Sequence, residues 1–233
     1  MFKRSKKYRA ALEKIQGKPA YSLTEGLKLL RETSAVKFDA TAELHLNLSL
    51  DPKKEDQSLR GTVVLPHGTG KKYKIAAIVP DEKVKEAMDA GATKAGLEDL
   101  IEEFSKGKIA YDIIIATPDV MKKLGKVAKT LGQKGMMPNP KSGTVTNDVK
   151  KTLTELMRGR VEYRNDKEGN LHLIFGKVSF KEEELENNLK TLLRAIRDSR
   201  PSGVKGSYIN SITLTSTMGP GIRLNVSETL SSL

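Results

Sequence analysis

Hydroxyl side chains recur at every second position near the end of the chain. They belong to Ser211, Thr213, Thr215 and Thr217, and the apolar Ile212 and Leu214 alternate with them. This alternation predicts a strand from Tyr208 to about Thr217 that carries the hydroxyls on one face. Hydroxyls in such a row can hydrogen-bond to phosphate oxygens, 2′-hydroxyls and base edges, which are contacts that recognise a folded RNA by its shape. The alternative is that Thr is simply favoured on exposed strands.

A second strand with the same pattern is predicted between Thr41 and Leu50. Its apolar side is formed by Ala42 and alternate Leu residues, and its other side carries Thr41, Glu43, His45 and Asn47. Such strict alternation indicates a sheet with one face on a core and one face open, as antiparallel sheets allow. We therefore expect the two polar rows to form one surface. The turn 218–221 follows the hydroxyl row, and its glycines could let another backbone approach closely.

Other chemistries have weaker support in the sequence. The segment 67–71 contains two glycines and a lysine but lacks the spacing of a phosphate-binding loop, so a linker turn is the better interpretation. No glycine-rich dinucleotide motif follows the apolar run 75–79, and no nucleophile elbow is found. His45 and His172 are interpreted as structural or surface residues. We predict no catalytic residue and no cofactor, and we expect that the protein is not an enzyme.

The residues that commonly hold metals or cross-link chains are scarce. The chain has no Cys, which excludes disulfides, iron–sulfur clusters and thiolate zinc sites, and it has only three scattered His. No metal site is predicted. The first residues lack the apolar stretch of a signal peptide, and no apolar run reaches the roughly 18–20 residues of a bilayer span. We expect an intracellular, cytoplasmic protein without membrane contact.

Positive charge points to a polyanionic partner. Lys and Arg number 41 and Asp and Glu 29, which gives a net charge of 41 − 29 = +12. Five basic residues fall within the first nine, and eight Lys against one acid fall between Lys122 and Lys151. Each run alone could be a solvated face. Together they favour binding of a polyanion such as nucleic acid, because only a polyanion relieves their mutual repulsion.

A loop in the middle of the chain combines shape and charge. Residues 132–143 hold three Gly, two Pro and two Lys. This composition predicts a defined backbone with a positive tip. The loop is either a tight connection between elements or a second contact for an anion.

The pattern of elements changes twice along the chain. Before residue 66, helices over 3–16 and from Ser22 precede the alternating strand and a short strand at 61–66. Between 67 and 158, fully apolar strands at 75–79 and 112–117 alternate with helices at 81–90, 97–106, 119–131 and 148–157, which is typical of βαβ units with a parallel sheet. After 159, we predict a hairpin of 161–164 with 171–175, a helix that begins with a capping box at Ser179–Glu182, the hydroxyl strand and a short strand at 222–226.

This order predicts a fold that combines α/β and α+β parts in two domains. A discontinuous α+β domain with an antiparallel sheet would comprise residues 1–66 and 159–233. A Rossmann-like α/β domain with a parallel sheet, residues 67–158, would be inserted into it. The alternative is three consecutive small domains, which is less favoured because the terminal pieces would have to fold alone.

Several motifs in one order resemble a known family, the bacterial ribosomal protein L-one of the large-subunit stalk. They span nearly the whole chain, and although each is modest alone, the set is specific. The motifs are Lys37-Phe38-Asp39 with Thr41 and Glu43, residues 60–71, Ile115-Ala116-Thr117-Pro118-Asp119, Met137-Pro138-Asn139-Pro140-Lys141, Val161-Glu162-Tyr163-Arg164 and Ser216-Thr217-Met218-Gly219-Pro220-Gly221.

The resemblance implies a function. Members of that family bind large-subunit rRNA directly to form the mobile stalk, assist the release of tRNA from the exit site, and repress their own operon by binding its mRNA. We therefore expect a ribosome-bound monomer within the large subunit, with rRNA, exit-site tRNA and the operon mRNA as partners. The alternative is an RNA-binding translational regulator that acts mainly off the ribosome.

The resemblance also implies the RNA-binding residues. The family's rRNA surface falls on Phe38, Thr41, Glu43, Thr217, Met218 and Gly219, with Ser211, Thr213 and Thr215 alongside. Lys37, Arg164 and Lys167 are expected to flank this surface. In this hypothesis neutral hydroxyls, one aromatic ring, one acid and a glycine turn give specificity, and the surrounding cations give general attraction.

Overall fold

The computed structural model describes residues 5–51, 54, 57–204 and 206–233. The chain divides into two compact units, one of Met1–Gly70 with Gly159–Leu233 and one of Lys71–Arg158. The first unit is thus built from both ends of the sequence. The expected domain limits were 66 and 159.

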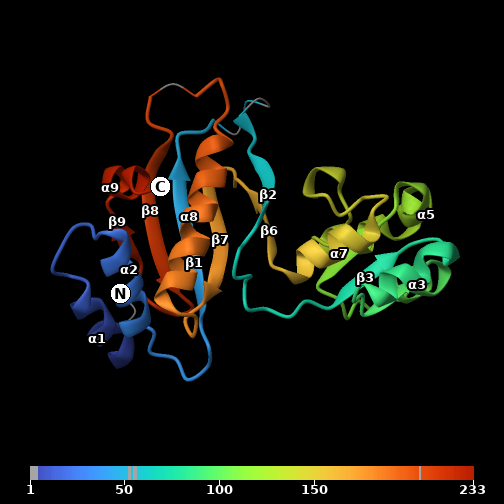
Figure 1. The fold of residues 1–233 in the computed structure, drawn as a ribbon, viewed down its shortest axis with the longest axis horizontal. Helices are drawn as coiled ribbons and strands as arrows, with labels where there is room; N and C mark the ends of the chain where they lie inside the picture. The colour runs from blue at the N-terminus through green and yellow to red at the C-terminus, as the bar shows by residue number, and fades with distance from the viewer. Residues whose placement is uncertain (1–4, 52–53, 55–56, 205) are drawn as a thin grey trace. The chain divides into compact units, whose positions relative to one another are not determined.

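A four-stranded sheet forms the centre of the first unit (Figure 1). Its strands are β1 (Thr41–Leu48), β7 (Asn170–Lys177), β8 (Ile209–Ser216) and β9 (Ile222–Leu224), in the order β7-β1-β8-β9. All neighbours are antiparallel. The predicted antiparallel sheet is confirmed, and it pairs a strand from before the second unit with strands from after it.

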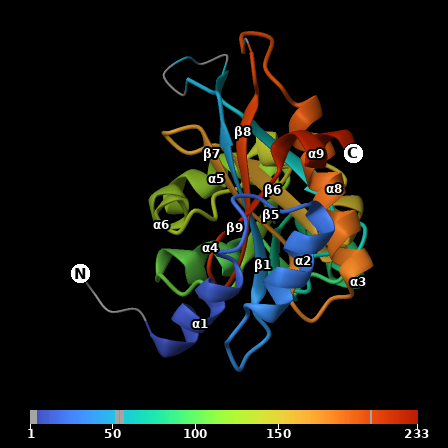
Figure 2. The same cartoon turned by 90° about the vertical axis from the view of Figure 1, so that its left-hand side faces the viewer.

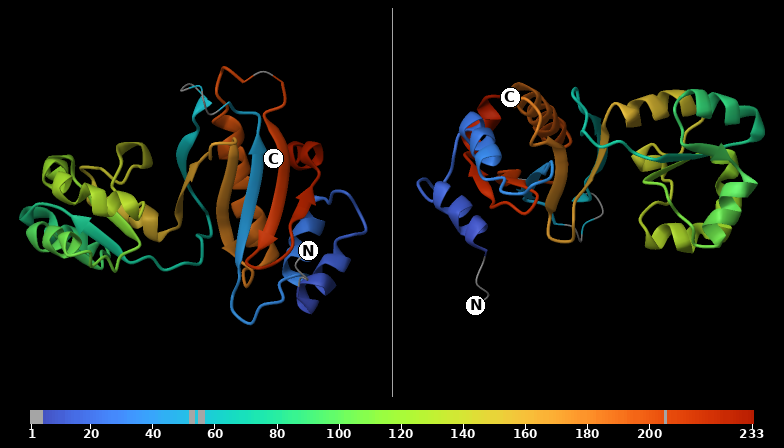
Figure 3. Two further views of the ribbon diagram at one scale, coloured as in Figure 1. Left: turned by 180° about the vertical axis from the view of Figure 1, so that it is seen from behind. Right: turned by 90° about the horizontal axis from the view of Figure 1, so that it is seen from below.

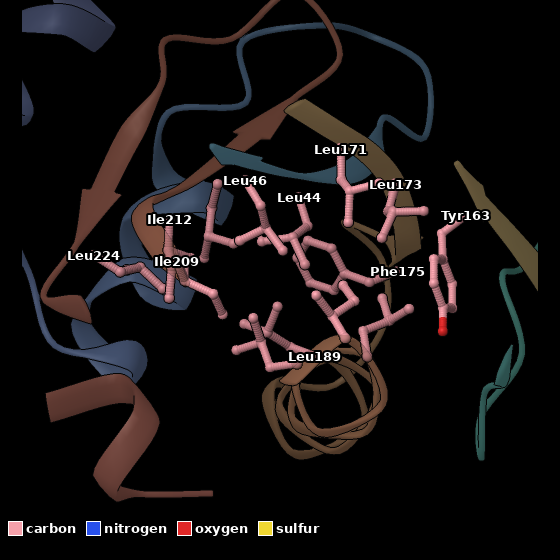
Figure 4. Close-up of a cluster of buried hydrophobic side chains, with 14 of the residues drawn as sticks. Leu44, Leu46, Tyr163, Leu171, Leu173, Phe175, Leu189, Ile209, Ile212 and Leu224 are labelled. Atoms are coloured by element: carbon pink, nitrogen blue, oxygen red, sulfur yellow. The ribbon is translucent and has the colours of Figure 1, made fainter. Parts of the chain in front are cut away.

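Two helices cover one face of this sheet. The helix α2 (Leu23–Glu32) begins with the predicted capping box, in which Ser22 and Glu25 satisfy each other's backbone N–H groups. The helix α8 (Glu182–Asp198) buries a stripe of Leu and Ile, and Figure 4 shows Leu189 of this helix pointing toward the inward side chains of the strands. Viewed from behind, β7, β1 and β8 have no helix in front of them (Figure 3, left). The sheet therefore has one packed and one open face.

Two short strands form a separate sheet in the same unit. They are β2 (Arg60–Val64) and β6 (Arg160–Arg164), which pair antiparallel along their full length. The predicted hairpin of β6 with β7 is wrong, because β7 pairs with β1 instead. The local sequence favoured the nearest partner, whereas the pairing that forms joins distant segments, as with His45 and His172, which are 127 residues apart in the chain.

Other elements of the first unit also differ from the prediction. The helix α1 spans Lys6–Lys14 within the predicted range 3–16, of which residues 3 and 4 lie outside the described residues. A final helix, α9 (Val226–Ser231), follows β9 and was not predicted. Figure 2 views the unit from the side on which α1 and α2 lie.

The predicted capping box at Ser179–Glu182 is also wrong. The cap position is Lys181, whose N–H donates to the Glu184 carboxylate at 2.9 Å. Ser179 instead donates its hydroxyl to Asp39 Oδ2 at 2.9 Å and its N–H to Oδ1 at 3.2 Å. A long-range carboxylate thus competes successfully for the serine that local sequence assigned to the helix.

The second unit contains the predicted parallel sheet. Its strands β3 (Ile75–Ile78), β4 (Lys94–Gly96) and β5 (Ile113–Ala116) are arranged in the order β4-β3-β5 and run parallel. The residues of β3 alternate between two apolar clusters, since Ile75 and Ala77 belong to one and Ala76 and Ile78 to the other. Burial on both faces explains why the strand is apolar throughout.

Helices pack against both faces of this sheet, because each of the two apolar clusters contains residues from helices. They are α3 (Asp81–Asp89), α4 (Glu98–Ser105), α5 (Met121–Leu124), α6 (Ala128–Gln133) and α7 (Val149–Met157). The predicted helix over 119–131 is broken into α5, the 3₁₀ turn η3 (Gly125–Val127) and α6. In neither unit does the described chain contain a helix that is long and apolar enough to cross a membrane.

Candidate nucleic-acid interface

The two polar rows meet on the open face of the antiparallel sheet. The register places Glu43 opposite Thr215, His45 opposite Thr213 and Asn47 opposite Ser211. The strand β7 adds Asn170, His172 and Lys177 on the other side of β1. We call this surface the hydroxyl face: the outward side chains of Thr41–Asn47 on β1, of Asn170, His172 and Lys177 on β7, and of Ser211–Thr217 at β8.

Two of the four hydroxyls hold the sheet and its turn. Thr217 Oγ1 accepts a hydrogen bond from the Thr41 N–H at 3.0 Å, and the Thr217 N–H donates to the Thr41 carbonyl at 3.0 Å. Thr215 Oγ1 lies 3.3 Å from the carbonyl oxygens of Ser216, Gly219 and Pro220. These two side chains therefore stabilise the sheet and its turn in addition to forming part of the surface.

The other two hydroxyls have no such partners. Ser211 and Thr213 are half-buried, and within the described residues neither hydroxyl is hydrogen-bonded to a protein group. A hydroxyl can donate one hydrogen bond and accept two. These side chains are thus available for a ligand laid across β8.

A strained turn ends the hydroxyl row. The Gly219 N–H donates to the Ser216 carbonyl at 2.7 Å, and Met218 has a φ of 66°. Positive φ at the third residue is typical of a type II turn, a position that usually holds Gly or Asn. Gly219 has no room for a side chain, because a Cβ there would overlap the Ser216 hydroxyl. Among the described residues Met218 is the sole non-glycine with positive φ, and such strain gathers at functional sites.

Two exposed apolar side chains lie at this end of the face. Phe38 is 58% exposed and Met218 is 79% exposed. Both line one pocket together with Lys37 and Gly219. An exposed aromatic ring beside a cation suits a nucleobase and its phosphate.

A pair of histidines occupies the middle of the face. The Nδ1 atoms of His45 and His172 lie 2.8 Å apart, so one ring donates and the other accepts. His45 Nε2 lies 3.7 Å from Glu43 and His172 Nε2 lies 3.6 Å from Asp166. Burial, and next the charge of His172, lower the pKa of His45, while Glu43 acts in the opposite direction. The neutral form of His45 is therefore favoured on this face.

Lys167 lies at the opposite end, in the turn before β7. That turn is built on Asp166, whose carboxylate accepts from the N–H groups of Glu168 at 2.8 Å and Asn170 at 2.7 Å. These bonds, with that from the backbone of Asn170 the largest cause, lower the pKa of Asp166 to about 2. Since Asn170 pairs with Asn47, this turn adjoins the end of β1 that lies roughly 20 Å from Thr41, at about 3.3 Å per residue.

Arg164 does not share the sheet with the other expected residues. It ends β6 and pairs with Arg60 in the two-stranded sheet. Its side chain is exposed. The strand pairing thus gives Arg164 no direct connection to the hydroxyl face.

Several residues in or beside the hydroxyl face were not predicted from the sequence. Lys177 Nζ donates to Thr41 Oγ1 at 2.9 Å, and the exposed Arg223 lies opposite Thr213. Asn47 donates to Asn170 at 2.8 Å and accepts from Asn210 at 3.0 Å. The strand itself was predicted at 171–175, and the alternation that places Asn170 and His172 on its outward side is the signal that could have added these residues to the face.

Two loops considered as anion contacts have well-defined partners. In the turn 67–70, the buried Asn188 accepts from the His67 N–H at 3.0 Å and donates to the Gly68 carbonyl at 2.9 Å. This supports a linker turn, since the His67 N–H faces a protein acceptor. In the second unit, Asn139 caps the 3₁₀ turn η4 (Pro140–Ser142), and Lys141 at its tip is exposed.

Comparisons with known proteins agree on one family. A sequence model of the "Ribosomal protein L1p/L10e family" matches residues 30–220. The chain is 48% identical over 223 residues to the "Large ribosomal subunit protein uL1" of Onion yellows phytoplasma (strain OY-M), and the match covers 96% of this chain and 97% of that protein. The match to the family model includes every residue of the hydroxyl face.

Proposed function

Because the chain belongs to the ribosomal protein L1p/L10e family, we propose that its hydroxyl face is the surface that binds large-subunit rRNA. The membership itself makes the chain a protein of the large ribosomal subunit that associates with rRNA. It also confirms the expectation that the protein is not an enzyme. What remains a proposal is the surface and the residues that bind.

One observation carries the proposal: a preformed polar sheet face is left uncovered and ends in an exposed aromatic ring. Thr215 and Thr217 fix the turn, and Ser211 and Thr213 keep hydroxyls for the ligand. A rigid face of this kind can read the shape of an RNA through phosphates, 2′-hydroxyls and splayed bases. Lys37, Lys177 and Arg223 supply positive charge around it.

Footprinting on large-subunit rRNA would test the partner and the site together. We expect one protected region, and we expect the protection to weaken in variants of Ser211 and Thr213. Affinity for an rRNA fragment should fall by roughly 0.7–0.9 log units per log unit of salt for each phosphate neutralised. A flat salt dependence would contradict a phosphate-rich interface.

Two finer functions follow from the family and are proposed for this chain. The assembled stalk would assist release of tRNA from the exit site, for which the exposed lysines of the second unit, such as Lys134 and Lys141, offer contacts. The hydroxyl face would also bind the mRNA of the protein's own operon and repress its translation, because an mRNA of similar shape would meet the same contacts.

These functions are separable by experiment. Cosedimentation with large subunits at moderate salt distinguishes a resident ribosomal protein from a regulator that acts mainly off the ribosome. A reporter with the operon leader tests repression, with Thr213→Val as the variant that should weaken it. Lys134→Ala with Lys141→Ala should slow tRNA release while leaving rRNA binding unchanged.

A further inference from the structure

A pocket of about 630 Å³ opens beside the end of the hydroxyl row. Three segments line it: α1, the residues that follow α2, and the turn after β8. Its volume falls within the roughly 300–1,000 Å³ of small-molecule sites. The residues that matter for its chemistry are Lys7, Tyr8, Ala11, Lys37, Phe38 and Met218.

The lining combines apolar surface with positive charge. Phe38 and Met218 are both largely exposed and line the same pocket, so they form one apolar patch of the kind that indicates a binding surface. Lys7 and Lys37 are the charged residues of the lining, and none of the described residues that form it is acidic. A flat apolar group attached to an anion is the ligand that fits this combination.

The pocket is continuous with the hydroxyl face. Met218 and Gly219 line the pocket and directly follow Thr217, the last residue of the hydroxyl face, which is bonded to Thr41 at the start of β1. A strand of RNA laid along β8 would therefore arrive at the pocket mouth. The positive φ of Met218 holds its side chain at this mouth at an energetic cost, which a purely structural turn with Gly would avoid.

We propose that this pocket receives one unstacked nucleobase of the bound RNA, with the adjoining phosphates on Lys7 and Lys37. The inference rests on the proposed function, since it assumes that the hydroxyl face binds RNA. It extends the interface to α1, from which no residue was assigned to binding. Stacking on aromatic side chains needs no particular base, so the pocket would select an unpaired nucleotide by position in the RNA and not by sequence.

The test uses the full-length protein and an rRNA stalk fragment with 2-aminopurine at one unpaired position at a time. We expect one position to change in fluorescence on binding, and an abasic site there to weaken binding roughly 5- to 150-fold, the range for loss of one stacked base. Ala11→Leu, which fills the pocket, should abolish this signal and lose a similar factor in affinity. If Ala11→Leu fails to fold, Phe38→Ala serves in its place, because Phe38 is exposed. It should also abolish the signal and lower the affinity.

Thr213→Val is the matched control. It should weaken binding of every fragment equally and leave the 2-aminopurine signal intact at saturation. If the wild-type protein binds the fragment, but no position responds and Ala11→Leu binds as tightly, the pocket proposal is overturned while the proposed function stands. If the wild-type protein binds no rRNA fragment, the proposed function itself fails. Loss of assembly into large subunits by Ala11→Leu with unchanged fragment binding would assign the pocket to a protein neighbour and overturn the proposal.

Discussion

The hydroxyl of Thr217 accepts a hydrogen bond from the N–H of Thr41 at 3.0 Å, so the end of the hydroxyl row is joined to the start of β1. Thr217 thereby stabilises the fold at the same point where the proposed RNA would contact it. Thr213, further along the row, has no such bond within the described residues. Substitutions at Thr213 and Thr217 can therefore distinguish an effect on RNA binding alone from an effect on both binding and stability.

Thr213→Val should lower RNA affinity and leave stability unchanged. Val has the shape of Thr but lacks the hydroxyl, and no protein partner is left without its bond. The loss in affinity should be about 0.5–1.5 kcal/mol, the net value of one hydrogen bond. Fragment binding by titration and urea unfolding measure the two quantities. Unchanged affinity would remove Thr213 from the interface.

Thr217→Val should lower both quantities. The Thr41 N–H loses its acceptor in a part-buried position, so the free energy of unfolding should fall by about 1 kcal/mol. RNA affinity should fall by about 1–3 kcal/mol, because the turn that carries Met218 and Gly219 loses its anchor. Thr217→Ser keeps the hydroxyl and is the control. A Val variant with wild-type affinity would refute the assignment of this end of the face.

Met218→Gly should weaken RNA binding without destabilising the protein. Gly adopts positive φ without the roughly 1–2 kcal/mol penalty of an L-residue, and this gain offsets the greater freedom of Gly in the unfolded chain. The exposed thioether side chain is lost, so fragment affinity should fall. Met218→Ala keeps the backbone strain and should lose affinity to the same extent. Equal binding by both variants and the wild type would show that the side chain is not used.

Stability should fall with acid in two separate ranges of pH. Burial lowers the folded-state pKa of His45 below its ordinary 6.5, so its contribution is present above pH 6.5 and is lost as the pH falls through the folded pKa. The pKa of Asp166 is lowered from 3.8 to about 2, so its contribution is lost between these values. Urea unfolding against pH should show both declines. His45→Gln should remove only the first and Asp166→Asn only the second.

Asn188→Leu should be strongly destabilising. The buried amide of Asn188 serves the His67 N–H and the carbonyls of Gly68 and Phe175, the last at 2.9 Å. Replacing it removes the partner of one buried and two part-buried backbone groups, at a cost of about 2–4 kcal/mol. Thermal unfolding checks the loss. Asn188→Asp keeps an acceptor for the His67 N–H and should be least harmful at a pH where the buried carboxyl is protonated, because that form can still donate to one carbonyl and buries no charge.

Local pattern was sufficient where one residue type alternated with another. The rows 41–48 and 209–216 could be predicted with their faces, because each outward residue differs in polarity from its inward neighbours. The two matching polar rows were also expected to share one surface, as the pairing of β1 with β8 shows, but other partners far apart in the chain could not be predicted. The β2–β6 pairing and the Asp39–Ser179 bonds both replaced a nearer local alternative.

The candidate site was predictable in part for the same reason. The hydroxyl row and its turn are visible in the sequence, whereas the pairing of β7 brings Lys177 into the face and the pairing of β9 places Arg223 beside it. The pocket is less visible still, since it joins α1 to a turn about two hundred residues later. The helix α9 has only six residues, which is too short for a helical apolar periodicity to show in the sequence.

The approach of Gly159 to Gly68 has a consequence for how this chain can vary. A Cβ on Gly159 would overlap the Gly68 backbone, and the Leu65 N–H donates to the Gly159 carbonyl at 3.2 Å, so the chain leaves the first unit and returns to it at one place. The intervening residues, Lys71–Arg158, form a loop whose base is already closed. The entropic cost of closing such a loop rises only slowly as the loop becomes longer. Evolution could therefore enlarge, trim or exchange the inserted module while every strand of the first unit kept its register.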